Sequence, residues 1–143
     1  MKKMNNKGFS LVELIVVIAI MAILVGALAP QLLKYIEKSR QANDVQAAGS
    51  AYTVITTAYL DPDVTNKPQA AFSNSALPGS AAAGTFNGEI WEGLGSKSVE
   101  LSSKAYKSDG IKFTLDSTGN ILVVLKSTVS GVPDKTIDAS GAH

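Results

Sequence analysis

The stretch FSLVELIVVIAIMAILVGALA, residues 9–29, decides the fold of this chain. Ser10 and Glu13 are the only polar side chains in it. As a helix it would be about 30 Å long, which matches the hydrocarbon core of a bilayer. The sequence therefore predicts a membrane-spanning helix. The lysines of the polar segment before it, MKKMNNKG at residues 1–8, should stay on the cytoplasmic side.

A secretory signal peptide is the first alternative interpretation of this segment. Ala27-Leu28-Ala29 supplies the A-x-A pattern of a cleavage site, and cleavage there would release a secreted binding protein or enzyme. Against this, Pro30 would directly follow the cut, and Glu13 is costly inside an apolar segment. A plain single-pass anchor is the second alternative, and it leaves Glu13 unexplained. The mature amino terminus would separate these alternatives.

Lys7-Gly8-Phe9-Ser10-Leu11-Val12-Glu13, followed by the long apolar run, resembles the class III signal of type IV pilins and pseudopilins. The resemblance implies that a prepilin peptidase cleaves after Gly8 and then methylates the new amino terminus, Phe9. Glu13 would be the fifth residue of the mature chain, where this family carries a glutamate with a role in assembly. Gram-negative pilins often close a carboxy-terminal loop with a disulfide, which this cysteine-free chain cannot do.

The same resemblance implies a structural subunit of a type IV pilus rather than an enzyme. Its expected partners are further copies of itself in a helical filament, the prepilin peptidase and methyltransferase, the membrane, the pilus assembly platform with its ATPase, and minor pilins. We expect the cytoplasmic membrane as the location of the precursor and stored subunit, and the cell surface for the assembled pilus. A pseudopilin of a type II secretion or DNA-uptake machine would carry the same motif, so that alternative stays open.

Helical spacing continues beyond the apolar run through residues 31–60, which predicts a weakly amphipathic helix that continues into the head of the molecule. The small residues Ala47–Ala51 should let this helix pack closely on a sheet. Asp61-Pro62-Asp63 should end it, because proline disfavours helical geometry in the preceding residue. The positions at helical spacing are Leu32, Ile36, Arg40, Asn43, Ala47, Ala51, Val54 and Ala58.

Gly26 and Pro30 form the expected helix break. Glycine weakens a helix, and proline removes a hydrogen bond and bends the axis. The alternative is a simple kink, whereas the resemblance suggests that a segment from around Ala22 to Pro30 loses helical order when subunits enter the filament.

The remaining sequence predicts a small β-rich head, so we expect an α+β fold in which a long amino-terminal helix, transmembrane in its first half, packs on an antiparallel sheet. Residues 61–110 should be an irregular αβ loop held to the core by Ile90, Trp91 and Leu94. Residues 111–143 should be an antiparallel β region and tail, because 111–115 alternate and 121–125 are rich in β-branched residues. The turn between these strands is Ser117-Thr118-Gly119-Asn120, further candidate strands are Val99–Leu101 and Thr136–Asp138, and His143 belongs to a frayed tail.

Composition excludes several functions. The chain has no cysteine and one histidine, so thiol chemistry and a Ser-His-Asp triad are unavailable. A net charge of +1 gives no general attraction to nucleic acid. Asp61 with Asp63, or Asp116 with Asn120, could offer oxygens to calcium, but neither group has the pattern of a calcium loop. The sequence thus predicts no catalytic, cofactor-binding or metal-binding residues.

Overall fold

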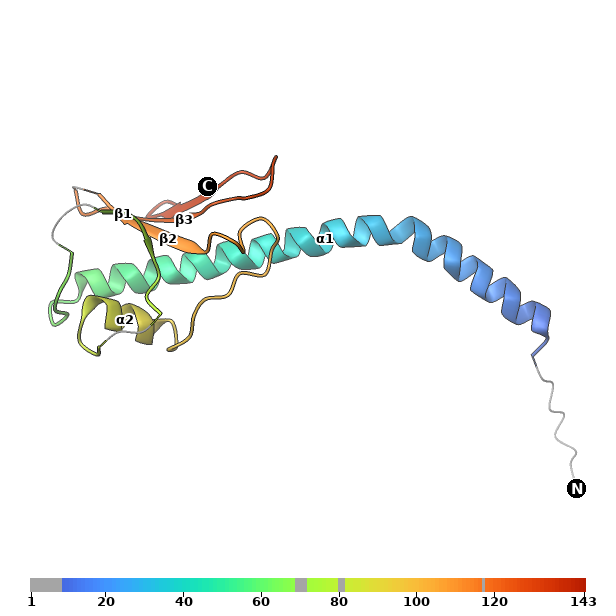
Figure 1. Cartoon of the computed structure of the whole chain (residues 1–143), viewed down its shortest axis with the longest axis horizontal. Coiled ribbons are helices and arrows are strands. Elements are labelled where there is room, and N and C mark those ends of the chain that lie inside the picture. The colour runs from blue at the N-terminus through green and yellow to red at the C-terminus, as the bar shows by residue number, and fades with distance from the viewer. Residues whose placement is uncertain (1–8, 69–71, 80–81, 117) are drawn as a thin grey trace, which may run out of the picture. The chain divides into compact units, whose positions relative to one another are not determined.

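The computed structural model describes residues 9–68, 72–79, 82–116 and 118–143, and the expected leader at residues 1–8 lies outside them. The chain divides into two compact units, Met1–Ile36 and Glu37–His143. The elements in chain order are α1 (Leu11–Leu60), β1 (Phe72–Ala76), α2 (Phe86–Gly93), β2 (Ile111–Leu115), β3 (Ile121–Leu125), β4 (Lys135–Asp138) and β5 (Gly141–Ala142) (Figure 1). The expected α+β class is confirmed.

Helix α1 ends where the sequence predicts, directly before Asp61. The Asp61 N–H still donates to the Thr57 carbonyl at 3.0 Å, and the Asp61 carboxylate accepts the N–H of Asp63 at 2.9 Å. The Lys67 ammonium donates to the Asp61 carbonyl. A cation at this point complements the partial negative charge of a helix C-terminus.

The buried face of α1 in the second unit differs from the predicted one. Its members are Asp44, Ala48, Ala51, Ile55 and Ala58. Ala51 and Ala58 were expected from the helical spacing and Ala48 as one of the small packing residues, whereas Asp44 and Ile55 were not expected. The sequence pattern was misleading because the face includes a carboxylate, Asp44, at a position that an apolar pattern does not select. Of the small residues predicted to pack, Ala48 and Ala51 are fully buried, Ala47 and Gly49 are half-buried, and Ser50 is exposed.

The five strands form one antiparallel sheet in the order β1-β2-β3-β4-β5. The predicted hairpin of β2 and β3 is confirmed, with Phe113 opposite Val123. One face of these strands is buried and the other half-buried, which is typical of a sheet packed on one side. Figure 1 shows the sheet and α2 against the part of α1 that belongs to this unit. The buried sheet residues are Ile111, Phe113, Leu115, Ile121, Val123, Leu125 and Ile137.

Residues 61–110 contain more regular structure than the sequence predicts. Strand β1 pairs with β2, and α2 begins at a Thr85 cap whose hydroxyl accepts the Gly88 N–H. Ile90 is fully buried and Leu94 packs against the core as expected, whereas Trp91 is only half-buried. The ring of Phe86 instead joins α2 to the core, since it lies 6.4 Å from the Phe113 ring.

Two predictions about the head are wrong. Val99–Leu101 is not a strand; the N–H groups of Ser102 and Ser103 that follow bond the Asp44 carboxylate rather than a neighbouring strand. His143 is not frayed, because its N–H and carbonyl both pair with the main chain of Thr136 beyond the short β4–β5 ladder. The predicted strand at Thr136–Asp138 is confirmed as part of β4.

Candidate processing and assembly site

Glu13 caps the start of α1. Its Oε2 accepts the Ser10 N–H at 2.8 Å, and the Ser10 Oγ accepts the Val12 N–H at 3.4 Å. This reciprocal arrangement is a variant of the capping box in which the serine oxygen bonds the second helical N–H instead of the third, and it satisfies N–H groups that lack partners at a helix N-terminus. This cap was not predicted from the sequence, although serine followed three residues later by glutamate before an apolar run is its usual signature.

The cap fixes one oxygen of Glu13 and leaves the other available. Among the residues that the structure describes, nothing bonds Oε1 of this carboxylate. Phe9, which should carry the new amino terminus after processing, precedes α1 and is 94% exposed. Gly8, the other residue of the predicted cleavage site, lies outside the described residues.

The first turns of α1 present an almost continuous apolar surface. Large side chains from Phe9 to Val25 are exposed on every side of the helix, and the most apolar window of α1 has a mean hydropathy of 3.0 with none of it buried. The helix is long and apolar enough to cross a membrane. Such a surface requires lipid or apolar partners around it.

Helix α1 runs through both Gly26 and Pro30 without interruption. No side chain or backbone outside the helix lies near Gly26, since a Cβ built there meets nothing within 4 Å. Close packing in the single chain therefore does not explain this glycine. The break expected at these two residues on assembly stays a prediction.

Two further carboxylates, Asp44 and Glu37, accept hydrogen bonds from the main chain of the head. Asp44, which is 2% exposed, accepts the N–H groups of Ser102 and Ser103 at 2.9 Å each. Glu37 accepts the Lys104 N–H at 2.7 Å. Burial alone would raise the pKa of Asp44, but the hydrogen bonds from Ser102 and Ser103 outweigh this effect and hold the pKa below its ordinary value. This site holds the 102–104 segment against α1.

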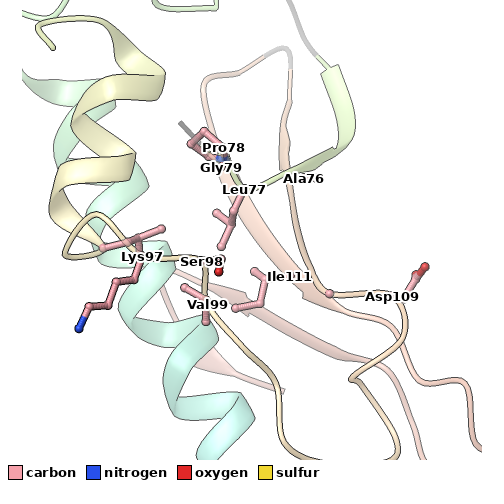
Figure 2. A pocket seen from close by; sticks show the side chains of 11 residues that line it. Ala76, Leu77, Pro78, Gly79, Lys97, Ser98, Val99, Asp109 and Ile111 are labelled. Carbon is pink, nitrogen blue, oxygen red and sulfur yellow. The ribbon is translucent and has the colours of Figure 1, made fainter. Parts of the chain in front are cut away.

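A cavity of about 190 Å³ opens near the end of β1, and Figure 2 shows the residues around it. Leu77, Val99 and Ile111 give it apolar walls, while Lys97 and Asp109 stand at opposite sides with their charged ends directed away from it. Asp109 is already paired with Lys112 at 3.0 Å. Among the described residues that line the cavity, no hydrogen bond joins the Ser98 hydroxyl to Lys97 or Asp109.

The candidate calcium-binding residues act as turn formers. The Asp116 carboxylate accepts from the N–H groups of Thr118 and Asn120, at 2.8 Å each. The Thr118 hydroxyl and these N–H groups hold the pKa of Asp116 below its ordinary value. Within the described part of the chain, no three acidic, histidine or cysteine side chains gather as a metal site would require.

Comparison with known proteins bears on the amino-terminal segment. Residues 3–29 match the family model described as the prokaryotic N-terminal methylation motif. The chain carries this motif. It includes the predicted cleavage junction at Gly8 and Phe9, the capping residue Glu13 and Gly26, and the resemblance to type IV pilins seen in the sequence is confirmed for this segment.

Individual relatives of the motif-bearing chain are fimbrial proteins. This chain is 39% identical over 59 residues to the type IV major fimbrial protein FimA of Dichelobacter nodosus, and the match covers 41% of this chain and 38% of that protein. Another protein of the same name and organism matches over the same length, with 37% of it covered. The chain thus spans less than half the length of the curated relatives it matches. No solved structure matches it at a significant level.

Proposed function

We propose that this chain is the structural subunit of a type IV pilus or related filament, cleaved after Gly8, methylated at Phe9 and polymerised through α1. One observation carries the proposal: the methylation motif coincides with a helix whose apolar side chains are exposed, joined to a compact sheet unit. An exposed apolar helix needs partners, and identical helices in a bundle supply them. Its function is then assembly and presentation of the head rather than catalysis.

Glu13 would set the register between neighbouring subunits. Burying a carboxylate near a helix centre costs about 2.5 to 3.5 kcal/mol, and less near an end. An amine at about 4 Å returns roughly 4 kcal/mol at an effective dielectric of 20. Attraction and desolvation nearly cancel, so the pair would favour one register over others more than it adds stability.

The capping box supports this role for Glu13. Because Oε2 is held by the Ser10 N–H, the carboxylate keeps a defined orientation and Oε1 has no partner in the described residues. Cleavage after Gly8 creates the amine at Phe9. The partner we favour is the Phe9 amine of a neighbouring subunit, since methylation keeps its positive charge.

The remaining partners follow from this assignment. The precursor would be stored in the cytoplasmic membrane with residues 1–8 on the inner side, where the prepilin peptidase and methyltransferase process it. An assembly platform with its ATPase would then extract it into the filament, together with minor pilins. The assembled filament would present the head at the cell surface.

The junction provides the test of this function. A strain that carries only Gly8→Val should accumulate an uncleaved membrane precursor and form no surface filaments, because the peptidase requires a small residue beside the apolar helix. Ser10→Thr is the matched control, since it also adds bulk near the junction but keeps Gly8 and a capping hydroxyl, and it should be processed. Normal mature protein from Gly8→Val would overturn the assignment.

A further inference from the structure

Three exposed cations at the start of the second unit make no ion pair with any residue that the structure describes. Lys38 and Arg40 lie on α1, and Lys104 lies on the segment that Asp44 and Glu37 hold to it. In the described residues the ion pairs are Lys112 with Asp109 and His143 with Asp138. We call Lys38, Arg40 and Lys104 the cationic cluster; Lys38 and Arg40 are two positions apart and so lie on different sides of the same turn of α1.

The carboxylates closest to the cluster are committed to the main chain. Arg40 has Glu37 three positions before it and Asp44 four positions after it, spacings at which a helix allows ion pairs. Glu37 instead accepts the Lys104 N–H at 2.7 Å, and Asp44 accepts two N–H groups from Ser102 and Ser103. The bond to Glu37 also places the Lys104 backbone beside the turn that carries Lys38 and Arg40.

The cluster lies on the part of α1 that follows the apolar span. That span ends at Ala29, and Lys38 follows Ala29 by nine positions, or about 14 Å along a helix. Lys34, Tyr35 and Ile36 are exposed between the two. Tyrosine is enriched where a helix leaves the bilayer, and cations just beyond an apolar span reach the phosphate layer.

These cations also oppose the usual charge bias of a membrane helix. Lysine and arginine close to a span favour the cytoplasmic side, and Lys38 and Arg40 are placed on the outer side by the proposed topology. The leader lysines compete with them only until cleavage. Binding to the phosphates of anionic lipids would offset this bias.

We propose that the cationic cluster binds anionic phospholipid headgroups on the outer surface of the membrane and holds the head against it while the subunit is stored. The inference rests on the proposed function, because it requires α1 to span the bilayer. Arg40 can bind a phosphate through two parallel N–H groups, and the two lysines act as point charges. Each cation should favour the docked head about fivefold near an anionic surface.

The test uses the full chain in lipid nanodiscs. The chain has no cysteine, so Asn43→Cys, an exposed site on α1, gives one position for a fluorophore. The discs contain phosphatidylcholine alone or with phosphatidylglycerol, and each contains the same fraction of lipid with a quencher on its headgroup. We expect stronger quenching in the anionic discs, and we expect added salt to remove the difference.

Charge-matched variants locate the effect. Lys38→Gln with Arg40→Gln should lower the ratio of docked to free heads about 25-fold if the two contributions add. Lys97→Gln with Lys135→Gln removes the same charge elsewhere on the head and should leave quenching unchanged. Thermal unfolding of both variants in detergent checks that the head is folded.

Each other outcome overturns the inference. Equal quenching in both lipids, or equal loss in both double variants, would show that the cluster does not bind headgroups. Quenching that follows the number of chains per disc instead of lipid charge would assign the cluster to contacts with a second copy. A wild-type chain that does not insert into the discs would refute membrane storage itself. Insertion without quenching would refute only lipid binding.

Discussion

At the residue scale, Glu13 and Asp44 use the same chemistry in different places. Each carboxylate accepts main-chain N–H groups that would otherwise lack partners, Glu13 at the start of α1 and Asp44 between α1 and the 102–104 segment. Sequence reasoning selected Glu13, because a charge in an apolar run is conspicuous. It missed Asp44, because its partners lie 58 and 59 residues away along the chain and nothing local indicates them.

Removing the charge of Glu13 should block assembly without blocking processing. Glu13→Ala still inserts and is still cleaved after Gly8, because loss of a charge eases entry into the bilayer. Surface filaments should fall at least about tenfold, which corresponds to a register preference of about 1.4 kcal/mol. Immunoblots of sheared filaments and of membranes measure the two quantities separately.

Glu13→Gln separates the charge from the cap. Its amide oxygen can still accept the Ser10 N–H, but it cannot attract an amine as a carboxylate does. We expect Gln to assemble as poorly as Ala. Recovery of wild-type filament yield with Gln would show that the cap alone matters and that the charge does not set the register.

Asp44→Asn should destabilise the head and change its response to acid. The amide has only one acceptor oxygen for N–H groups that two oxygens now serve, so we expect a loss of about 1 to 3 kcal/mol near neutral pH. The folded pKa lies below the ordinary value of 3.8, so the contribution of the carboxylate is present above that value and is lost as pH falls through the folded pKa.

Thermal unfolding in detergent micelles from neutral to acidic pH checks this. The gap between wild type and Asp44→Asn should narrow as the pH falls below the ordinary aspartate range. Asn43→Ala, at the exposed neighbouring position, should stay within about 0.5 kcal/mol of wild type. A gap that is the same at every pH would contradict the role of the charged form.

At the scale of elements, long regular patterns were predictable and short pairings were not. The apolar run predicted α1, alternation predicted β2, and β-branched residues predicted β3. Strand β1 has the sequence FSNSA, in which Phe72 is the one residue of a type enriched in strands, and its pairing is irregular between Phe72 and Ser75. β5 is two residues long and depends on β4 for its existence. Such elements depend on tertiary contacts, so the local sequence pattern does not predict them.

Contact between α2 and α1 depends on a glycine. A Cβ at Gly93 would lie 2.5 Å from Cγ1 of Val54 on α1, so Gly93→Ala should cost about 1 to 3 kcal/mol. Adding Val54→Ala should recover part of that loss. Gly49 lies on α1, and a Cβ built there meets nothing within 4 Å. Gly49→Ala should therefore stabilise the fold by about 0.5 to 1 kcal/mol. Equal thermal shifts for both single variants would contradict close packing at Gly93.

The helix break belongs to α1 in the filament. In the single chain α1 is continuous through Gly26 and Pro30. We predict that a segment from around Ala22 to Pro30 loses helical order on assembly, and that Gly26→Ala, which favours the helix by about 0.5 to 1 kcal/mol, lowers filament yield. A filament density map resolves the segment directly. An unbroken helix through Gly26 in that map would refute the prediction.

At the scale of the molecule, the two units differ in how far sequence explains them. The processing motif is local, so residues 7–13 sufficed to indicate a filament subunit. The head is built from long-range contacts, and its cationic cluster is visible only once Glu37 and Asp44 are seen to be engaged elsewhere. What the head contacts outside the membrane therefore has to be measured.

The mature amino terminus of chains in purified surface filaments tests the central claim most directly. Intact-mass and fragmentation spectra should show a chain that begins at Phe9 with one added methyl group and that lacks residues 1–8. Chains that begin at Pro30 would identify a secreted protein released by signal peptidase. Chains that keep Met1, or filaments without this chain, would contradict the account.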